Sequence, residues 1–275
     1  MESAGAVRRI ASSSPGVLVG VREAGAVDAP PLLFLHGFPL SGAMWGPQVE
    51  EFAADWRTLA PDVRGCGTSD VGTGQYTMET LVDDLFAVLD QTVGGEPVAA
   101  VGLSMGGYIL LRALEREPAR FRGVALCDTR SGADGRTGKL ARAIGIRRIE
   151  REGLEPFVDD FLAAVLAPGT RQTRPDLWHG LKRLMMENSP IGVRGQLLAM
   201  ASRIDTGRVL EKISVPALVV NGGEDRLTRP SAGQAMAAKI PNAVFSTIEG
   251  AGHLSSIEAP GEFNRILRRY LTYVR

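Results

Sequence analysis

Cysteine is scarce in this sequence, with Cys66 and Cys127 as the two residues of that type among 275. They lie in unrelated segments, and neither stands in the C-x-x-C or Cys/His spacing that is typical of zinc sites. Two isolated cysteines do not suggest a disulfide framework, and without such spacing they do not suggest a zinc site. We therefore expect two free thiols, no metal site and no cofactor.

Long apolar runs and an excess of charge are also missing. No run approaches the roughly 18 apolar residues of a membrane helix, and the first residues, MESAGAVRRI, lack the apolar core of a signal peptide. We therefore expect a cytoplasmic protein that does not bind membranes. The 31 Lys and Arg balance the 31 Asp and Glu, so the basic field that nucleic-acid binding requires is absent. A small molecule is the expected partner.

Short apolar segments alternate with helical patterns along most of the chain. The expected strands, apolar enough to be covered on both faces, are residues 32–35, 58–60, 98–103, 124–127, 217–221 and 244–248. Helical spacing of apolar residues follows in 78–93, 108–117 and 260–273. This alternation predicts an α/β fold with a mainly parallel sheet and helices on both faces. Segments 7–11 and 17–22 are expected to form an antiparallel hairpin at its edge.

The alternation stops after Asp128 and resumes near Pro216. Residues 131–205 are helical in pattern and rich in Arg, Gly and Pro. We interpret them as a helical cap inserted into a core made of residues 1–130 and 206–275. The Arg-rich stretch 136–151 is interpreted as the solvated face of a cap helix rather than an anion site.

A nucleophile is predicted at Ser104. The motif Gly102-Leu103-Ser104-Met105-Gly106 follows an expected strand and precedes an expected helix, which is the context of a nucleophile elbow. Such a turn strains the backbone of the serine, and small residues two positions before and after it let strand and helix approach. A glycine-rich turn capped by a serine is the structural alternative.

A serine hydroxyl needs a base, and the chain has three histidines, His36, His179 and His253. His253 follows the last expected strand, at the sheet edge where open α/β folds place their sites, and is the predicted base. His36 is better suited to shaping a loop. His179, beside Trp178, is interpreted as a partly exposed helix residue.

The base in turn needs an acid to fix its tautomer. Asp225 follows the strand 217–221 and lies between Ser104 and His253 in the chain, and it is the preferred candidate. Asp128, at the end of an earlier strand, is its rival, and the unused one is expected to cap a loop.

When the serine attacks a carbonyl group, the carbonyl oxygen becomes negatively charged and needs hydrogen-bond donors. The backbone N–H of Met105 and that of Phe38, in the loop His36-Gly37-Phe38-Pro39, are the expected oxyanion hole. Leu40, Trp45 and Trp178 are expected to face the gap between sheet and cap and to bind an apolar part of the substrate. Residence in the core is the alternative for Trp45 and Trp178.

Taken together, these motifs resemble the α/β-hydrolase family almost end to end. The matching segments are HGFP at 36–39, DVRGCGTS at 62–69, GLSMGG at 102–107, GGED at 222–225 and GAGH at 250–253. The resemblance implies the order serine, aspartate, histidine, which favours Asp225 over Asp128. Where the family usually has a larger residue this chain has Cys66, whose small thiol could widen the site mouth.

The resemblance narrows the reaction further. Because the nucleophile is a serine, acyl transfer is expected rather than the chemistry of superfamily members with a nucleophilic aspartate. HGFPLSGAMW is similar to cofactor-free haloperoxidases (perhydrolases), and DTRSGAD at 128–134 resembles small bacterial esterases and enol-lactonases. We predict hydrolysis of carboxylic esters, or of lactones such as 3-oxoadipate enol-lactone. Perhydrolysis with hydrogen peroxide is the second enzymatic hypothesis, and a ligand receptor on a catalytically silent fold is the non-enzymatic one.

Overall fold

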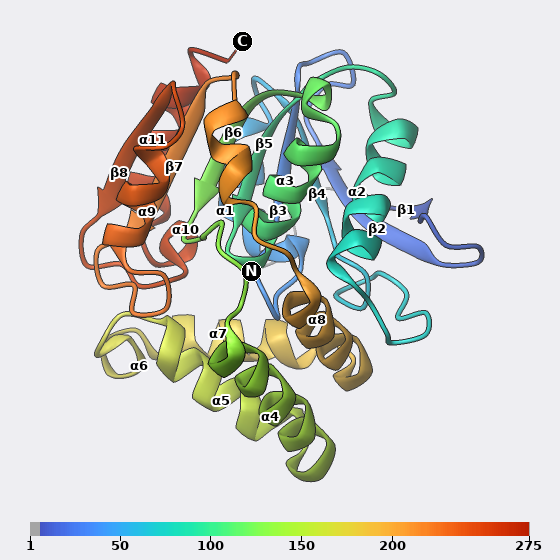
Figure 1. Ribbon diagram of the computed structural model, residues 1–275, viewed down its shortest axis with the longest axis vertical. Coiled ribbons are helices and arrows are strands. Elements are labelled where there is room, and N and C mark those ends of the chain that lie inside the picture. Colours follow the sequence, from blue (N-terminus) through green and yellow to red (C-terminus); the bar gives the residue numbers. More distant parts are fainter. Residues whose placement is uncertain (1–5, 275) are drawn as a thin grey trace.

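An eight-stranded sheet forms the centre of the computed structural model, which describes residues 6–274 (Figure 1). Its strands are β1 (Ala6–Ala11), β2 (Leu18–Ala24), β3 (Pro31–Leu35), β4 (Arg57–Pro61), β5 (Val98–Leu103), β6 (Phe121–Cys127), β7 (Ala217–Gly222) and β8 (Ala243–Ile248). They lie in the order β1-β2-β4-β3-β5-β6-β7-β8. The pairs β1/β2 and β2/β4 are antiparallel, and the remaining pairs are parallel. Every strand expected from the sequence is present, as is the edge hairpin. Coverage on both faces is wrong for β8, because it lies at the edge of the sheet and Val244 is exposed.

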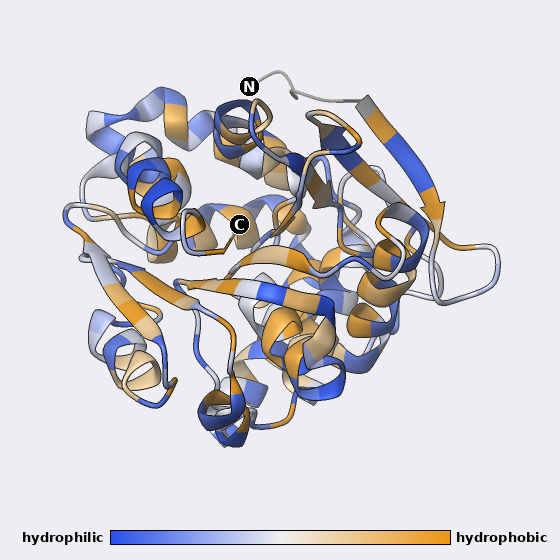
Figure 2. Cartoon of the chain, turned by 90° about the horizontal axis from the view of Figure 1, so that it is seen from above, coloured by the Kyte–Doolittle hydropathy of each residue, from blue (hydrophilic) through white to orange (hydrophobic). Residues whose placement is uncertain are grey.

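Helices cover both faces of this sheet. They are α1 (Gly46–Phe52), α2 (Met78–Thr92), α3 (Met105–Arg116), α9 (Pro230–Ala237), α10 (Ser255–Glu258) and α11 (Pro260–Leu271), with short 3-10 turns η1 (Gly42–Trp45), η2 (Pro118–Arg120) and η3 (Gly207–Lys212). Figure 2 shows helices with both apolar and polar segments, as expected where one side of a helix is buried.

Neighbouring residues of β3 show how the two layers arise. The ring of Phe34 packs against Trp45 and Phe52, on the side where α1 meets α11. Leu35, the next residue, points to the opposite side and lies with Leu81 of α2 and Ile109 of α3. Successive side chains of a strand alternate between its faces, so an uninterrupted apolar strand can support a helix layer on each.

Five further helices gather at one end of the sheet (Figure 1). They are α4 (Arg136–Glu152), α5 (Leu154–Val165), α6 (Thr170–Thr173), α7 (Pro175–Met186) and α8 (Pro190–Ser202), and we call them the cap helices. The segment that leads into the cap helices and the segment that follows them lie side by side. The N–H of Thr206, after α8, donates to the carbonyl of Ser131, before α4, at 3.1 Å. Beside this bond, the buried carboxylate of Asp134 pairs with Arg203 at 3.0 Å. Both connections to the sheet are therefore held together.

No helix in the described part of the chain is long and apolar enough to cross a membrane. Within residues 6–274, no group of three or more His, Cys, Asp or Glu side chains is arranged to hold a metal ion.

Candidate active site

Ser104 occupies a strained turn between β5 and α3. Its φ of 52° and ψ of −110° lie in a region that residues with a side chain rarely adopt. A Cβ placed on Gly102 would lie 2.7 Å from the carbonyl oxygen of Gly106, and one on Gly106 would lie 2.2 Å from that of Leu35. The two glycines of the motif are thus required by close backbone packing, which supports the interpretation of this turn as a nucleophile elbow.

Three side chains from distant parts of the sequence meet at this turn. The Oγ of Ser104 lies 2.8 Å from Nε2 of His253, and Nδ1 of His253 lies 2.8 Å from Oδ2 of Asp225. His253 is 1% exposed and Asp225 is 3% exposed, whereas Ser104 is 8% exposed. Ser104, His253 and Asp225, which we call the triad residues, therefore form one continuous line of hydrogen bonds that is largely shielded from water.

The acid of this line is held by its own loop. Oδ1 of Asp225 accepts from the backbone N–H groups of Leu227 and Thr228, at 2.8 and 2.9 Å. The hydroxyl of Thr228 donates to Oδ2 at 2.5 Å and lies 3.1 Å from Nδ1 of His253. Burial alone would raise the pKa of Asp225, but the hydrogen bond and charge of His253, together with Thr228, outweigh burial and lower it. The carboxyl is therefore ionised at neutral pH.

Thr228 was missed by reasoning from the sequence. The signal that could have found it is local, because an Asp side chain commonly accepts from backbone N–H groups two or three residues further on. The third residue after Asp225 is therefore brought next to its carboxylate.

The rival acid has a different set of partners. Asp128 directly follows β6 with a φ of 45°, and its Oδ1 accepts from the N–H of Gly222 at 2.8 Å. Its Oδ2 accepts from the hydroxyl of Ser255 at 2.5 Å. Of the two candidates, Asp225 is the one that the structure brings to His253.

The loop after β3 lies against Ser104. A Cβ on Gly37 would stand 2.8 Å from Cδ2 of Leu103 and 3.5 Å from Cβ of Ser104. Nε2 of His36 accepts from the N–H of Val63 at 2.8 Å, so Nδ1 carries the proton and donates to the carbonyl of Gly37 at 3.0 Å. Burial lowers the pKa of His36, which keeps this ring neutral. His36 thus shapes the loop, as expected, and is not directed at Ser104.

Two backbone N–H groups near Ser104 remain the candidates for the predicted oxyanion hole. Met105 is the first residue of α3, where an N–H has no acceptor within its own helix. Phe38 follows Gly37 in the loop beside Ser104, and in the described residues its N–H has no protein acceptor. The remaining histidine, His179, is exposed on α7.

The residues expected to bind substrate separate into two groups. Leu40 and Trp178 are buried, and the guanidinium of Arg171 lies 4.8 Å from the Trp178 ring. Trp45 does not face the gap beneath the cap helices. Its ring packs 5.1 Å from Phe34 and 6.0 Å from Phe263, because η1 turns it toward the layer of α1 and α11. Trp45 therefore belongs to the core, and the expectation of a substrate contact is corrected.

Two aromatic residues of the cap were not anticipated. The rings of Phe157 and Phe161 on α5 lie 6.0 and 5.5 Å from the ring of Phe38, both edge-on. Their separation of four residues in a helical pattern places them on one helix face. This aromatic cluster of Phe38, Phe157 and Phe161 joins the cap helices to the loop after β3.

Cys66 lies where the segment 62–69 meets α8. Its Sγ accepts from Nε2 of Gln196 at 2.8 Å, and a Cβ on Gly192 would lie 2.0 Å from the carbonyl oxygen of Gly65. Burial raises the pKa of the Cys66 thiol, so the thiol is neutral. Its small size fits the close contact between this segment and the cap.

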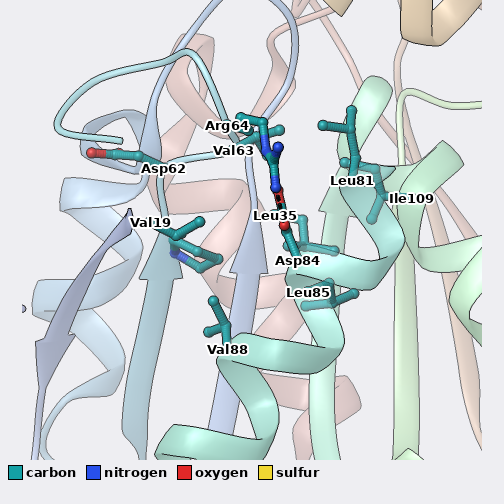
Figure 3. Close-up of a pocket in the computed structure, with 11 residues that line it drawn as sticks. Val19, Leu35, Asp62, Val63, Arg64, Leu81, Asp84, Leu85, Val88 and Ile109 are labelled. Atoms are coloured by element: carbon teal, nitrogen blue, oxygen red, sulfur yellow. Dashed lines mark hydrogen bonds and ion pairs between the residues drawn. The ribbon is translucent and has the colours of Figure 1, made fainter. Parts of the chain in front are cut away.

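A separate pocket lies between α2 and the strands β2, β3 and β4 (Figure 3). Arg64 and Asp84 are among the residues that line it, and they form an ion pair with a distance of 2.6 Å. None of the triad residues lines this pocket. This pocket therefore contains a buried ion pair and is separate from the candidate catalytic residues.

Comparisons with known proteins agree with this geometry. Residues 30–260 match the model of the alpha/beta hydrolase fold family. The 3-oxoadipate enol-lactonase 2 of Acinetobacter baylyi is 28% identical over 240 residues, which cover 87% of this chain and 88% of that protein. A putative non-heme bromoperoxidase of Mycobacterium tuberculosis is 29% identical over 258 residues, covering 89% and 95%.

Solved structures give the same result. A thermophilic esterase from Thermogutta terrifontis superposes with a TM-score of 0.92 and 31% identity, covering 98% of this chain and 99% of that one. The family match extends over most of the chain and includes the segments that bear Ser104, Asp225 and His253. The chain therefore belongs to the alpha/beta hydrolase fold family.

Proposed function

We propose that this protein hydrolyses carboxylic esters, lactones included, through an acyl-enzyme on Ser104. The observation that carries the proposal is the unbroken line of hydrogen bonds from Ser104 through His253 to Asp225. His253 takes the Ser104 proton on Nε2 as Oγ attacks the substrate carbonyl. Asp225 accepts from Nδ1–H, holds the tautomer that leaves Nε2 free, and stabilises the imidazolium that forms.

The oxyanion is assigned to the N–H groups of Phe38 and Met105. As the carbon–oxygen bond to the alcohol breaks, His253 returns the proton to the leaving alkoxide. Water then attacks the acyl carbon while His253 takes its proton. As the bond between the acyl carbon and Oγ of Ser104 breaks, His253 passes that proton to Oγ, which releases the carboxylic acid and restores Ser104. Each oxyanion donor contributes about 2.7 to 4 kcal/mol to the stability of such a transition state.

The aromatic cluster supports an apolar substrate group. Phe157 and Phe161 reach the ring of Phe38, next to the assigned oxyanion donor, so an acyl or alcohol group bound there meets ring faces and edges. The proposal includes the division into a core of residues 1–130 and 206–275 and a cap of residues 131–205, with Leu40 and Trp178 as further apolar contacts.

Turnover of p-nitrophenyl esters from acetate to decanoate tests the proposal. We expect activity in the unmodified protein and its loss in Ser104→Ala, with Ser246→Ala on β8 as a matched serine control that retains it. Hydrolysis that persists in Ser104→Ala would refute the assignment of the nucleophile. Absence of turnover in the unmodified protein would favour a silent receptor on this fold.

A second reaction follows from the similarity to a putative non-heme bromoperoxidase. In perhydrolysis, hydrogen peroxide replaces water at deacylation, and a peracid leaves instead of the acid. Peroxide-dependent bromination in acetate buffer measures it. We expect ester hydrolysis to be the faster reaction, and faster bromination would reverse the order of the two functions.

A further inference from the structure

We propose that Asp128 is a positioning residue that ties the loop of the acid Asp225 to the loop of the base His253. The inference rests on the proposed function of the triad residues. Asp128 does not touch the reacting atoms in this arrangement. It acts through the two segments that its carboxylate joins.

Each oxygen of the Asp128 carboxylate serves a different loop. Oδ1 accepts from the N–H of Gly222 at 2.8 Å, three residues before Asp225. Oδ2 accepts from the hydroxyl of Ser255 at 2.5 Å, two residues after His253. Asp128 is wholly buried, so both contacts are shielded from bulk water.

The backbone of Asp128 is itself fixed for this task. Its φ of 45° lies in the left-handed region, which is uncommon for a residue with a side chain. The N–H of Asp128 donates to the carbonyl of Val220 at 2.8 Å, which continues the pairing of β6 with β7. Strain of this kind persists where surrounding contacts over-determine it, and here those contacts come from the two triad loops.

The charge of Asp128 adds a second effect. Burial, more than any other influence, raises the pKa of Asp128 to about 7. The titratable groups that act on it are His253 and Asp225, and Cys127 precedes it with a thiol whose pKa burial raises well above its usual range. Above pH 7 the ionised carboxylate stabilises a protonated His253, which is the state that forms in the transition state.

Two variants separate the contacts from the charge. Asp128→Asn keeps an oxygen for Gly222 and an amide donor for the Ser255 oxygen, but it stays neutral. We expect its kcat/KM to match that of the unmodified protein below pH 6 and to fall about threefold or more below it at pH 8, because the lost interaction is electrostatic. Asp128→Ala loses both contacts as well as the charge, and we expect kcat to fall about tenfold below pH 6 and further at pH 8, with little change in KM.

Ser255→Ala supplies the matched partner. Because Ser255 acts through Asp128, the double variant Asp128→Ala/Ser255→Ala should be no slower than Asp128→Ala alone. Multiplied losses in the double variant would contradict the proposed tie. A role limited to folding would lower Tm in Asp128→Ala and leave its kcat unchanged. It would also leave the ratio of kcat/KM between Asp128→Asn and the unmodified protein the same at every pH. Either result overturns the proposal.

A proton NMR measurement makes the inference independent of turnover. The Nδ1–H of His253, donated to Asp225, should give a low-field resonance in the unmodified protein that Asp128→Ala broadens or shifts and Asp128→Asn retains. If no ester is turned over but this resonance responds, the proposed function fails and the positioning role stands. If esters are hydrolysed and neither kcat nor the resonance changes in Asp128→Ala, the positioning role alone fails.

Discussion

The hydroxyl of Thr228 donates to Oδ2 of Asp225 at 2.5 Å, on the same oxygen that faces Nδ1 of His253. The carboxylate therefore has one oxygen saturated by backbone N–H groups and one shared between a hydroxyl and the imidazole. This arrangement limits rotation of the Asp225 side chain and orients His253 toward Ser104.

Thr228→Val is expected to loosen this orientation. The variant keeps the shape of the side chain and removes the donor to Asp225, so kcat for a p-nitrophenyl ester should fall about tenfold, equivalent to one lost hydrogen bond to a charged group. Thr228→Ser should restore most of the rate. Equal rates in the Val variant and the unmodified protein would show that the hydroxyl has no role.

Asn188 is expected to couple the cap helices to the loop after β3, which carries the proposed oxyanion donor Phe38. Its Nδ2 donates to the carbonyl of Pro39 at 2.7 Å, and its Oδ1 accepts from the N–H of Gly67 at 2.7 Å. Asn188→Ala leaves the buried carbonyl of Pro39 unpaired, at a cost of about 1–3 kcal/mol, removes the acceptor of the N–H of exposed Gly67, and releases the loop that carries Phe38. We expect a lower Tm and a kcat about tenfold lower. Exposed Asn242→Ala is the control, and a kcat as low in that variant would contradict the coupling.

The packing of the elbow predicts a contrast between two glycines. Gly106→Ala places a Cβ 2.2 Å from the carbonyl oxygen of Leu35, and such overpacking costs about 1–3 kcal/mol. In Gly261→Ala, on α11, the added Cβ has no neighbouring atoms within 4 Å. Because Ala favours a helix more than Gly does, this variant should increase the free energy of unfolding by up to about 1 kcal/mol. Calorimetric Tm values should therefore move in opposite directions, and a Gly106→Ala protein as stable as the unmodified one would refute the close packing.

The raised pKa of Asp128 predicts how stability depends on pH. Its value of about 7 in the folded protein exceeds the value near 4 of an unfolded Asp. Between these values the folded state binds more protons, so stability falls as pH rises through the window and remains lower above it. Asp128→Asn should therefore raise Tm by a few degrees at pH 8 and leave it nearly unchanged at pH 4. A Tm difference that is constant with pH would exclude the shift.

The positions of the strands along the chain could be predicted because the central ones, such as β3, β5 and β7, are short and largely apolar. Their order in the sheet was not predicted, since no local pattern shows which strands pair. Ser104, Asp225 and His253 could also be placed, because each follows a strand of a parallel sheet and such strands end at one edge. Helices α1 and α9 were not expected, since α1 begins at a turn and α9 is short and weakly patterned.

Side-chain direction accounts for what the sequence could not predict. Trp45 is a large apolar residue in the loop after β3, which suggested a substrate contact, but the turn at η1 directs its ring into the core. Phe157 and Phe161 look like ordinary helix residues until the cap is placed over Phe38. The two partners of Asp128, at Gly222 and Ser255, lie 94 and 127 residues away from it, and no local pattern reveals contacts of that range.

Intact-mass spectrometry after treatment with an alkyl phosphonate ester tests whether Ser104 is the nucleophile. We expect one adduct per chain, mapped by peptide analysis to Ser104, with simultaneous loss of ester hydrolysis and no adduct in Ser104→Ala. An unlabelled protein, or an adduct on any other residue that abolishes hydrolysis, would contradict this role of Ser104.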